Sequence, residues 1–522
     1  MYDKEKVKLN HIFIGYADGE LEAERLDFEN IFYKDEDKYN QIVNDPHKFI
    51  LSGKKGTGKT ILSKYIEKVE GQKGALCKII KLQDFNLQRL MELGYRNFED
   101  YELTVFFKWT MFYEICKLII ANRSSILNYS NISSYEKFKH FIKYSNNIKK
   151  IKSIFKIRYP SGNYSKVNFT TSNGLKVSND LNNKISDFLN IKSSMEDSRS
   201  ITSVYQKKDY YQILQEIEQL IIPCLKYTRV IIIYDDLDQI DNSILDNKFY
   251  NRLLIALLEA AKDINHEFCA SNSKGCKIIT LIRSDILSAL QMNSSNLNKL
   301  TTDSEVKLYW IDKYFTVPEN HSLMNLVLTK IQNSVPEYSS LNKHDLYSLL
   351  FPDSIDGKTV INYLLDYSFG RPRDIIAYLN IIINEYPNCT FFGANLFKKC
   401  NAKYSKWFYT ELLNELSNHH DCSYTKDSLN LISDLGHQTF DFSLLEKYFN
   451  QNVKQYPNIN DLKECINFLY NFGVLGNSWR TFSSVPSKKY RYSWSYIDDD
   501  YSSANFNKKF IVHYGLKKIF SL

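Results

Sequence analysis

The 522-residue chain lacks several patterns that would place it in a particular protein class. No apolar run reaches the roughly eighteen residues needed to cross a bilayer, so we expect no membrane partner. The first residues carry charges but neither a long apolar stretch nor a small-residue cleavage site, so we expect no signal peptide. The nine cysteines stand singly, without a CxxC pair, which favours reduced thiols and a cytoplasmic protein.

The sequence also gives no support for a nucleophilic catalytic site or for a zinc site. No spacing of Ser, His and Asp, or of Cys and His, argues for nucleophilic catalysis. His419, His420 and Cys422 fit no common four-ligand zinc pattern, so we interpret them as part of a polar loop. What remains is a chain with 43% hydrophobic and 24% charged residues, typical of a globular protein with roughly two to four domains.

Glycine is scarce, with 18 residues in the chain, yet the stretch GKKGTGKT at residues 53–60 holds three of them. It matches the pattern G-x-x-x-x-G-K-[ST], which this composition would produce by chance only rarely. The apolar segment Phe49-Ile50-Leu51 precedes it, and residues 60–69 have the apolar spacing of a helix. Strand, loop and helix in this order are the context that a phosphate-binding loop requires, whereas a Gly-rich surface turn is the alternative.

The residue types in this stretch suit phosphate. Glycines let successive backbone N–H groups turn toward phosphate oxygens, and the following helix adds the positive end of its dipole. Lys59 would neutralise charge on the β- and γ-phosphates, and the Thr60 hydroxyl would ligate Mg²⁺. The candidate nucleotide-binding residues of the loop are Gly53, Gly56, Thr57, Gly58, Lys59 and Thr60.

A second apolar segment ends in carboxylates. VIIIYDDLD reads as a buried strand with Asp235, Asp236 and Asp238 at its carboxyl end, where ligands lie in open α/β sheets. We assign Asp235 to the metal ion, Asp236 to the attacking water and Asp238 to a cap of the next turn. A strand that simply ends in a polar turn is the alternative.

The apolar pattern predicts an α/β fold with a parallel sheet, a large insertion, a mostly helical segment and a C-terminal domain. With the motif at 53–60, this is the sheet of a P-loop NTPase, and the resemblance described below implies that the helical segment is a lid. Strands are expected at 49–51, 76–82, 230–234, 277–282, 306–311, 490–497 and 510–513. Helices are expected over 20–32, 60–69, 103–121, 247–264 and 461–472, and a hairpin over 167–177. The predicted domains are a lead-in (1–48), a P-loop core (49–318) with an insertion at about 86–215, a helical lid (319–400) and a winged-helix-like domain (401–522).

The net charge of +7 is distributed unevenly. Nine basic residues and no acidic one lie between Lys137 and Lys166, inside the expected insertion. A basic stretch with interspersed aromatic residues attracts polyanions through counterion release, so residues 137–166 are a candidate contact for nucleic acid. A solvated insertion with ordinary lysine bias is the alternative.

Four motifs in series resemble a known family. GKKGTGKT (53–60), VIIIYDDLD (230–238), KIITLIRSDIL (277–287) and FGRPRDI (369–375) resemble motifs of the STAND and KAP-like P-loop ATPases, prokaryotic relatives of the AAA+ class. The resemblance covers roughly residues 10–400, and the long insertion separates the first two motifs. It implies ATP and Mg²⁺ as cofactors and ATP hydrolysis as the activity.

The resemblance also implies roles for polar residues beyond the loop. Thr280, Arg283 and Ser284 lie where the family carries a polar sensor on the strand after the acidic one. The segment Gly370 to Arg373 is similar to the family's Gly-x-Pro-Arg sensor, which implies that Arg373 contacts the γ-phosphate and that Arg371 adds a second cation. Surface arginines at a helix start are the alternative.

Three functions stay open at this point. In the first, ATP drives a conformational or assembly switch in bacterial signalling or antiviral defence, through self-association or a protein effector. In the second, a DNA-handling ATPase uses the basic insertion and residues 405–522, which resemble a winged helix. In the third, the chain is a nucleotide-bound scaffold without catalysis. The catalytic candidates are Lys59, Asp236 and Arg373, with Arg252 as a candidate arginine finger between subunits.

Overall fold

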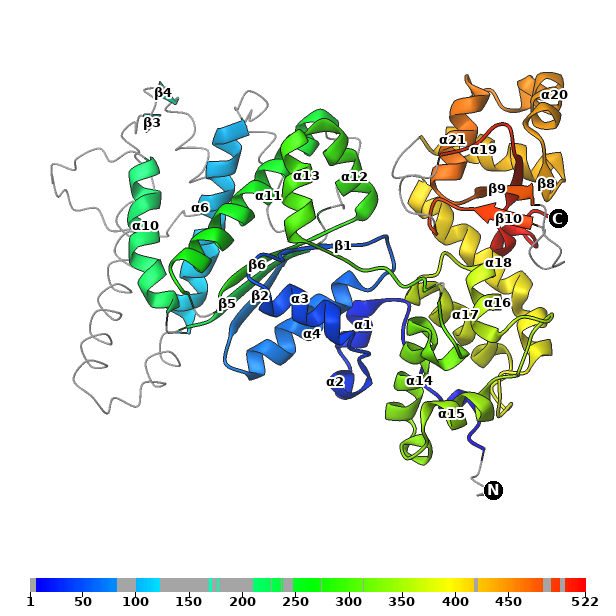
Figure 1. The fold of residues 1–522 in the computed structure, drawn as a ribbon, viewed down its shortest axis with the longest axis horizontal. Coiled ribbons are helices and arrows are strands. Elements are labelled where there is room, and N and C mark those ends of the chain that lie inside the picture. The colour runs from blue at the N-terminus through cyan, green and yellow to red at the C-terminus, as the bar shows by residue number, and fades with distance from the viewer. Residues whose placement is uncertain are drawn as a thin grey trace, which may run out of the picture. The chain divides into compact units, whose positions relative to one another are not determined.

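The computed structural model divides the chain into two compact units (Figure 1). Unit 1 comprises Met1–Lys34, Lys54–Ile61 and Leu308–Leu522, and unit 2 comprises Asp35–Gly53 and Leu62–Lys307. The structure describes residues 6–81, 100–122, 169–170, 176–177, 210–226, 228–235, 237, 247–273, 275–312, 314–416, 421–481, 490–497 and 503–522. Within these ranges, no helix combines the length and apolar character needed to span a membrane. All nine cysteines are free thiols.

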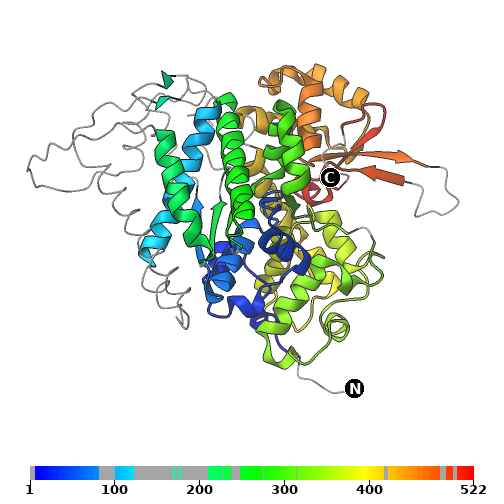
Figure 2. The same cartoon turned by 60° about the vertical axis from the view of Figure 1, so that its left-hand side comes forward.

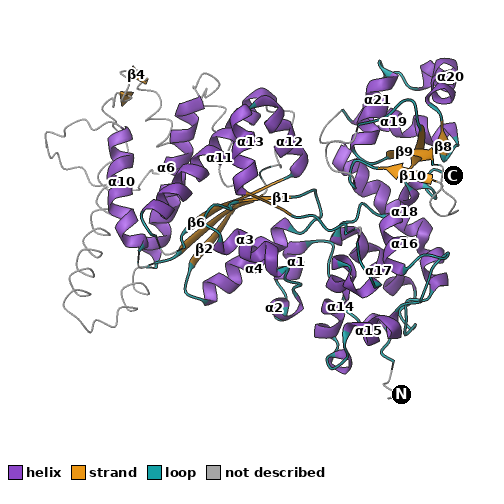
Figure 3. Ribbon diagram, in the orientation of Figure 1, coloured by secondary structure: helices purple, strands orange, loops and turns teal. Residues whose placement is uncertain are grey.

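A parallel five-stranded sheet forms the centre of unit 2 (Figure 3). Its strands are β1 (Ile50–Ser52), β2 (Leu76–Lys81), β5 (Val230–Asp235), β6 (Lys277–Ile282) and β7 (Glu305–Lys307), in the order β2-β5-β6-β1-β7. Every neighbouring pair is parallel, so all five carboxyl ends lie at the same edge. The predicted α/β class with a parallel sheet is therefore confirmed.

Helices cover both faces of this sheet, which explains why its inner strands β5 and β6 are mostly apolar. Helices α6 (Asp100–Ala121), α10 (Tyr210–Leu225) and α11 (Asn247–Ala270) lie on one face, and α3 (Glu36–Asn44) and α4 (Lys59–Gln72) on the other (Figure 1). Every residue of β5 and β6 is buried. Helices α12 (Ser284–Asn293) and α13 (Ser295–Ser304) connect β6 to β7.

The predicted strands and long helices of unit 2 form within about three residues of their expected bounds, with two larger differences. The strand expected over 306–311 ends at Lys307; the residues after it belong to unit 1, where Trp310 donates a hydrogen bond to a backbone carbonyl. The helix expected over 247–264 continues to Ala270. The predicted hairpin is present as β3 (Phe169–Thr170) and β4 (Lys176–Val177), which pair antiparallel.

The single helix predicted over 20–32 is wrong. The chain forms two short helices instead, α1 (Gly19–Ala23) and α2 (Phe28–Ile31). Between them, the Arg25 guanidinium donates two hydrogen bonds of 2.8 Å to the Asp27 carboxylate, a local contact that competes with a continuous helix. Leu26 is fully exposed, so the apolar spacing that suggested one helix does not form a buried stripe.

Helices also dominate the middle of unit 1. They are α14 (Ser322–Ser334), α15 (Lys343–Leu350), α16 (Val360–Tyr367), α17 (Pro372–Glu385) and α18 (Ala394–Leu416). Pro372 opens α17 at a position where its missing N–H costs nothing. Just before it, Gly370 has a φ of 64°, and a Cβ there would lie 2.5 Å from the Ile311 side chain. The sharp turn Ser368–Arg371 therefore requires glycine at this position.

The C-terminal part of unit 1 combines helices with a four-stranded antiparallel sheet. The helices are α19 (Cys422–Leu435), α20 (Phe442–Asn452) and α21 (Leu462–Asn471), and the strands are β8 (Thr439–Phe440), β9 (Leu475–Arg480), β10 (Tyr490–Ser493) and β11 (Lys509–Val512). The strand order is β10-β9-β11-β8. The predicted last helix and the two predicted strands are present; β10 is shorter than expected, and β11 has the expected length but begins one residue earlier. The winged-helix assignment and the predicted domain boundaries stay predictions.

A buried aromatic cluster joins this sheet to the turn before α17. The His513 ring lies 5.0 Å from that of Phe369 and 5.1 Å from that of Phe408, centroid to centroid. Its Nδ1 accepts a hydrogen bond from the Gly515 N–H at 3.0 Å, so Nε2 carries the proton, 3.3 Å from the Ser368 carbonyl oxygen. Burial lowers the pKa of His513 to about 3, which keeps the folded ring neutral above that pH.

We expect His513 to make the protein less stable as the pH falls from 7 to 5. The ordinary pKa of 6.5 applies when the chain is unfolded and a pKa of about 3 when it is folded, so the unfolded state binds more protons between these values. The titration of His513 should then lower the free energy of unfolding by about 2 kcal/mol between pH 7 and pH 5. Denaturant unfolding at several pH values measures how the free energy of unfolding changes with pH. This change should be smaller in His513→Phe than in the unaltered protein. Equal slopes in both proteins would contradict the prediction.

Candidate nucleotide-binding site

The loop 53–58, which connects β1 to α4, adopts a backbone conformation that needs glycine at two positions. The φ angles of Gly56 and Gly58 are 82° and 96°, where a residue with a side chain is strained. A Cβ on Gly56 would also lie 3.1 Å from the Cβ of Arg373. Helix α4 begins directly after the loop, at Lys59, so its first N–H groups have no acceptor within the helix.

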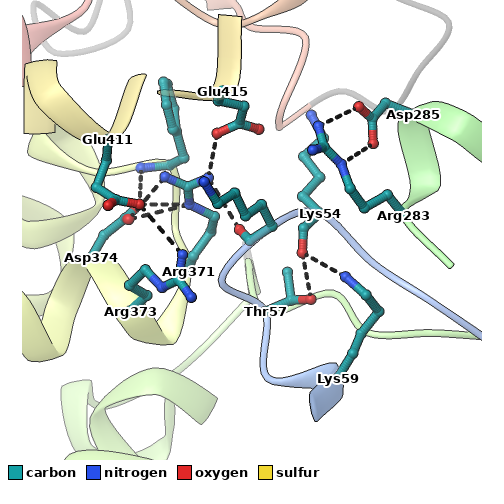
Figure 4. A network of polar contacts seen from close by, with 12 residues as sticks. Lys54, Thr57, Lys59, Arg283, Asp285, Arg371, Arg373, Asp374, Glu411 and Glu415 are labelled. Carbon is teal, nitrogen blue, oxygen red and sulfur yellow. Dashed lines mark hydrogen bonds and ion pairs between the residues drawn. The ribbon is translucent and has the colours of Figure 1, made fainter. Parts of the chain in front are cut away.

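The carbonyl group of Lys54 accepts hydrogen bonds from the loop and from the first residue of α4 (Figure 4). The Lys54 carbonyl accepts hydrogen bonds from Thr57 Oγ1 at 2.8 Å and from Lys59 Nζ at 3.2 Å. The Lys59 side chain is thus folded back over the loop, and its ammonium group contacts an uncharged acceptor. A phosphate oxygen would be a stronger acceptor for this ammonium group because the bond would be charged on both sides.

The next three carbonyl groups accept hydrogen bonds from residues 310–373 of the same unit. The donors are Arg371 Nη1 to Lys55 O at 3.1 Å, the Arg373 N–H to Gly56 O at 3.4 Å, and Trp310 Nε1 to Thr57 O at 2.8 Å. In a trans peptide the N–H points opposite to the carbonyl of the same unit. The N–H groups of Gly56 and Gly58 therefore face away from these donors, as an anion-binding loop requires.

Arg371, predicted as an extra cation for phosphate, is buried among carboxylates (Figure 4). Its Nε and Nη2 donate to Asp374, with bonds of 3.0 Å each, and its Nη1 donates to Glu415 at 2.9 Å. Burial alone would lower the pKa of Arg371, but the charges of Asp374 and Glu415 outweigh burial and raise it above its ordinary value. The guanidinium is thus permanently charged and already paired.

Arg373, predicted to sense the γ-phosphate, has weaker partners. Its Nε donates to the Ala17 carbonyl at 3.1 Å and its Nη1 lies 3.4 Å from the Glu411 carboxylate. The side chain is only half-buried. Arg373 could exchange these contacts for a phosphate at lower cost than Arg371 could, since a long, partly exposed ion pair contributes little.

Unit 2 places several predicted site residues near the carboxyl edge of its sheet. Asp235 ends β5 and is buried, and the Ser284 N–H donates a 3.3 Å hydrogen bond to the carbonyl of Gly53, directly after β1. The buried Ser284 hydroxyl has no hydrogen-bond partner among the described residues. Thr280 lies further back, because it pairs with Ile50 at the start of β1. Of these two sensor candidates, Ser284 is therefore the one that lies at this edge.

Two other arginines predicted at the site are engaged by carboxylates in unit 2. Arg283 donates hydrogen bonds of 3.0 and 2.6 Å to Asp285 (Figure 4). Arg252, the candidate arginine finger, lies on α11 and pairs with Asp100 at 2.6 Å. The contact of either arginine with a phosphate stays a prediction that requires the guanidinium to change partners.

Some predicted residues lie outside the described ranges: Asp236, Asp238, residues 137–166, His419 and His420. Among the described residues, no group of three or more His, Cys, Asp or Glu side chains forms a metal site. Sequence reasoning missed Trp310, Glu411 and Glu415. The two glutamates are four residues apart on α18, a spacing that places both on one helix face and could have suggested partners for the arginine pair. No sequence signal marks Trp310.

The comparisons with known proteins add a family match for part of the chain. Residues 321–413 match the FunZ-associated C-terminal helical domain, a range that includes Arg371, Arg373 and Glu411. No curated protein matches the chain. Among solved structures, a Walker-type ATPase of Pyrococcus abyssi is 12% identical with a TM-score of 0.35, over 89% of this chain and 95% of that one. A TM-score this low carries no argument about fold or activity.

Gly56→Ala should destabilise the protein by about 1–3 kcal/mol, because alanine is strained at this φ and its Cβ meets Arg373. Gly71→Ala is the matched control. Gly71 lies within α4, and a Cβ there meets nothing within 4 Å, so this change should stabilise by about 0.5–1 kcal/mol. Urea unfolding measures both, and a neutral Gly56→Ala would show that the loop does not need this conformation.

Proposed function

We propose that the protein is a P-loop NTPase that binds ATP with Mg²⁺. The observation that carries the proposal is the loop 53–58, whose carbonyl groups meet protein donors between a parallel strand and the start of α4. Outward-facing N–H groups and a helix N-terminus together favour an anion such as a phosphate chain. The choice of ATP over other nucleotides rests on the resemblance to STAND and KAP-like ATPases alone.

In this proposal, the residues at the start of α4 act on the phosphates. Lys59 would leave the Lys54 carbonyl and stabilise charge on the β- and γ-phosphates. The Thr60 hydroxyl and the Asp235 carboxylate are oxygen donors of the kind that Mg²⁺ prefers, and a buried carboxylate such as Asp235 gains from a nearby cation. When bound, Mg²⁺ neutralises charge on the phosphate oxygens.

ATP hydrolysis extends the proposal to Asp236, which would orient the attacking water, and to Arg373, which would contact the γ-phosphate. Arg373 would exchange Ala17 and Glu411 for phosphate, so nucleotide state would alter its contact with α18. This exchange supports a conformational or assembly switch, and the resemblance extends it to signalling or defence. Without hydrolysis, the chain would act as a nucleotide-bound scaffold.

Lys59→Ala should weaken ATP binding roughly 10- to 100-fold, since it removes a charged hydrogen bond to phosphate, and should abolish turnover. Lys64→Ala is the matched control, because Lys64 lies on the same helix and its contact within the described residues is an ion pair with Glu67 at 3.7 Å. Fluorescent-nucleotide titration with Mg²⁺ and phosphate release measure the two effects. If Lys59→Ala and the unaltered protein bind ATP equally, the loop is only a turn.

A second candidate function is nucleic-acid contact by the C-terminal sheet. Tyr490 pairs with Arg480 and Tyr492 with Ser478, so both tyrosines and Arg480 lie on one face of the β9–β10 pair, drawn in orange in Figure 2. Tyr490 is 58% and Tyr492 46% exposed. Exposed aromatic rings beside cations are the features that stack on and attract single strands. The basic tract 137–166, the other candidate contact, lies outside the described residues.

Replacing both Tyr490 and Tyr492 with alanine should weaken binding of a single-stranded oligonucleotide by at least about fivefold, since stacking contributes roughly 1–3 kcal/mol per base. Tyr314→Ala is the control, because Tyr314 is 91% exposed in the same unit but far from this sheet in sequence. Fluorescence anisotropy at several salt concentrations measures the affinities. If the double variant binds as well as the unaltered protein, this face is not the contact.

A further inference from the structure

The phosphate loop is held by two side chains that lie outside the strand–loop–helix motif. Trp310 Nε1 donates to Thr57 O at 2.8 Å, and Arg371 Nη1 donates to Lys55 O at 3.1 Å, both ordinary hydrogen-bond lengths. The third external bond, from the Arg373 N–H to Gly56 O, is long at 3.4 Å. Trp310 and Arg371 therefore provide the firm contacts.

The chemistry of both side chains suits a carbonyl group. An indole has a single donor and no acceptor, so Trp310 can only fix an acceptor such as Thr57 O. The charge of Arg371 is compensated by Asp374 and Glu415, and its guanidinium lies 4.9 Å from the ring centroid of Phe369. A buried cation already paired with two carboxylates is a rigid donor rather than an available phosphate ligand.

Arg371 is connected to the C-terminal part of unit 1. Asp374, which binds Arg371, also accepts the Phe369 N–H at 2.9 Å. The Phe369 ring packs against the C-terminal aromatic cluster, 5.1 Å from Tyr496. Glu415 lies near the end of α18. A continuous series of contacts thus runs from the C-terminal sheet to Arg371 and on to the phosphate loop.

We infer that Trp310 and Arg371 are positioning residues for the phosphate chain, an inference that rests on the proposed nucleotide site. By fixing the carbonyl groups of Lys55 and Thr57, they fix the N–H groups of Gly56 and Gly58 before nucleotide arrives. The free-energy cost of ordering the loop when a phosphate chain binds is then smaller. The helical and C-terminal regions are part of the nucleotide site, and their effect falls on phosphate recognition rather than on the base.

Trp310→Phe tests this directly, because it removes the donor and keeps a ring. Affinity for ATP and for inorganic tripolyphosphate should fall by the same factor, roughly 3- to 10-fold, as expected for one hydrogen bond. Tyr309→Phe is the matched control: it removes a 2.9 Å hydrogen bond to the Ile497 carbonyl in the same unit. Unchanged affinity for both probes in Trp310→Phe would overturn the inference, as would an equal loss in Tyr309→Phe.

A second variant tests Arg371 without removing it. Arg371→Ala would leave Asp374 buried and uncompensated and could unfold the protein, whereas Glu415→Gln keeps a side chain of the same shape but removes one charge that holds the guanidinium. We expect Glu415→Gln to weaken tripolyphosphate binding severalfold at a temperature well below its unfolding transition. The control is Glu446→Gln, an exposed position on α20. Equal affinities in the two variants would show that Arg371 does not position the loop.

The outcome for Lys59→Ala separates this inference from the proposed function. If the unaltered protein binds neither ATP nor tripolyphosphate, or binds them as Lys59→Ala does, the nucleotide site itself is wrong and the inference fails with it. If Lys59→Ala loses binding while Trp310→Phe and Glu415→Gln retain it, the nucleotide site stands and only the positioning role fails. Parallel losses in all three variants support both.

Discussion

The hydrogen bond from Arg371 to the Lys55 carbonyl is the contact on which the arrangement of the candidate site depends. A guanidinium that is 4% exposed is expensive to bury, and it is retained only because Asp374 and Glu415 compensate its charge. The two carboxylates hold the guanidinium in one position and orientation. The Lys55 carbonyl therefore accepts a hydrogen bond from a donor that other parts of the fold have oriented.

This dependence agrees with the division of the chain: the segment Lys54–Ile61, which holds most of the loop and the start of α4, belongs to unit 1, whereas β1 and the rest of α4 belong to unit 2. The residues that hold its carbonyl groups, Trp310 and Arg371, lie more than 250 residues further along the chain. The loop therefore cannot take its final conformation from β1 and α4 alone. Its local glycines permit the conformation, and the distant donors select it.

The parts of the fold that depend on local pattern were predictable from the sequence. Continuous apolar runs marked β5 and β6, and glycine spacing marked the loop 53–58, because burial and backbone freedom are properties of the residues themselves. The break between α1 and α2 was not predictable from apolar spacing, because that spacing shows neither the Arg25–Asp27 contact nor the exposure of Leu26. Nor was Trp310, whose role depends on a partner distant in sequence.

Arg371 and Arg373 show how two residues of one type, separated only by Pro372, can come to differ. Arg371 precedes the first turn of α17, where the turn Ser368–Arg371 directs it into the core and toward two carboxylates. Arg373 lies within the first helical turn and remains half-buried beside a single long ion pair. The sequence motif treats both as phosphate cations. Their surroundings make Arg371 a fixed donor to the loop, whereas Arg373 has weaker contacts that can be exchanged.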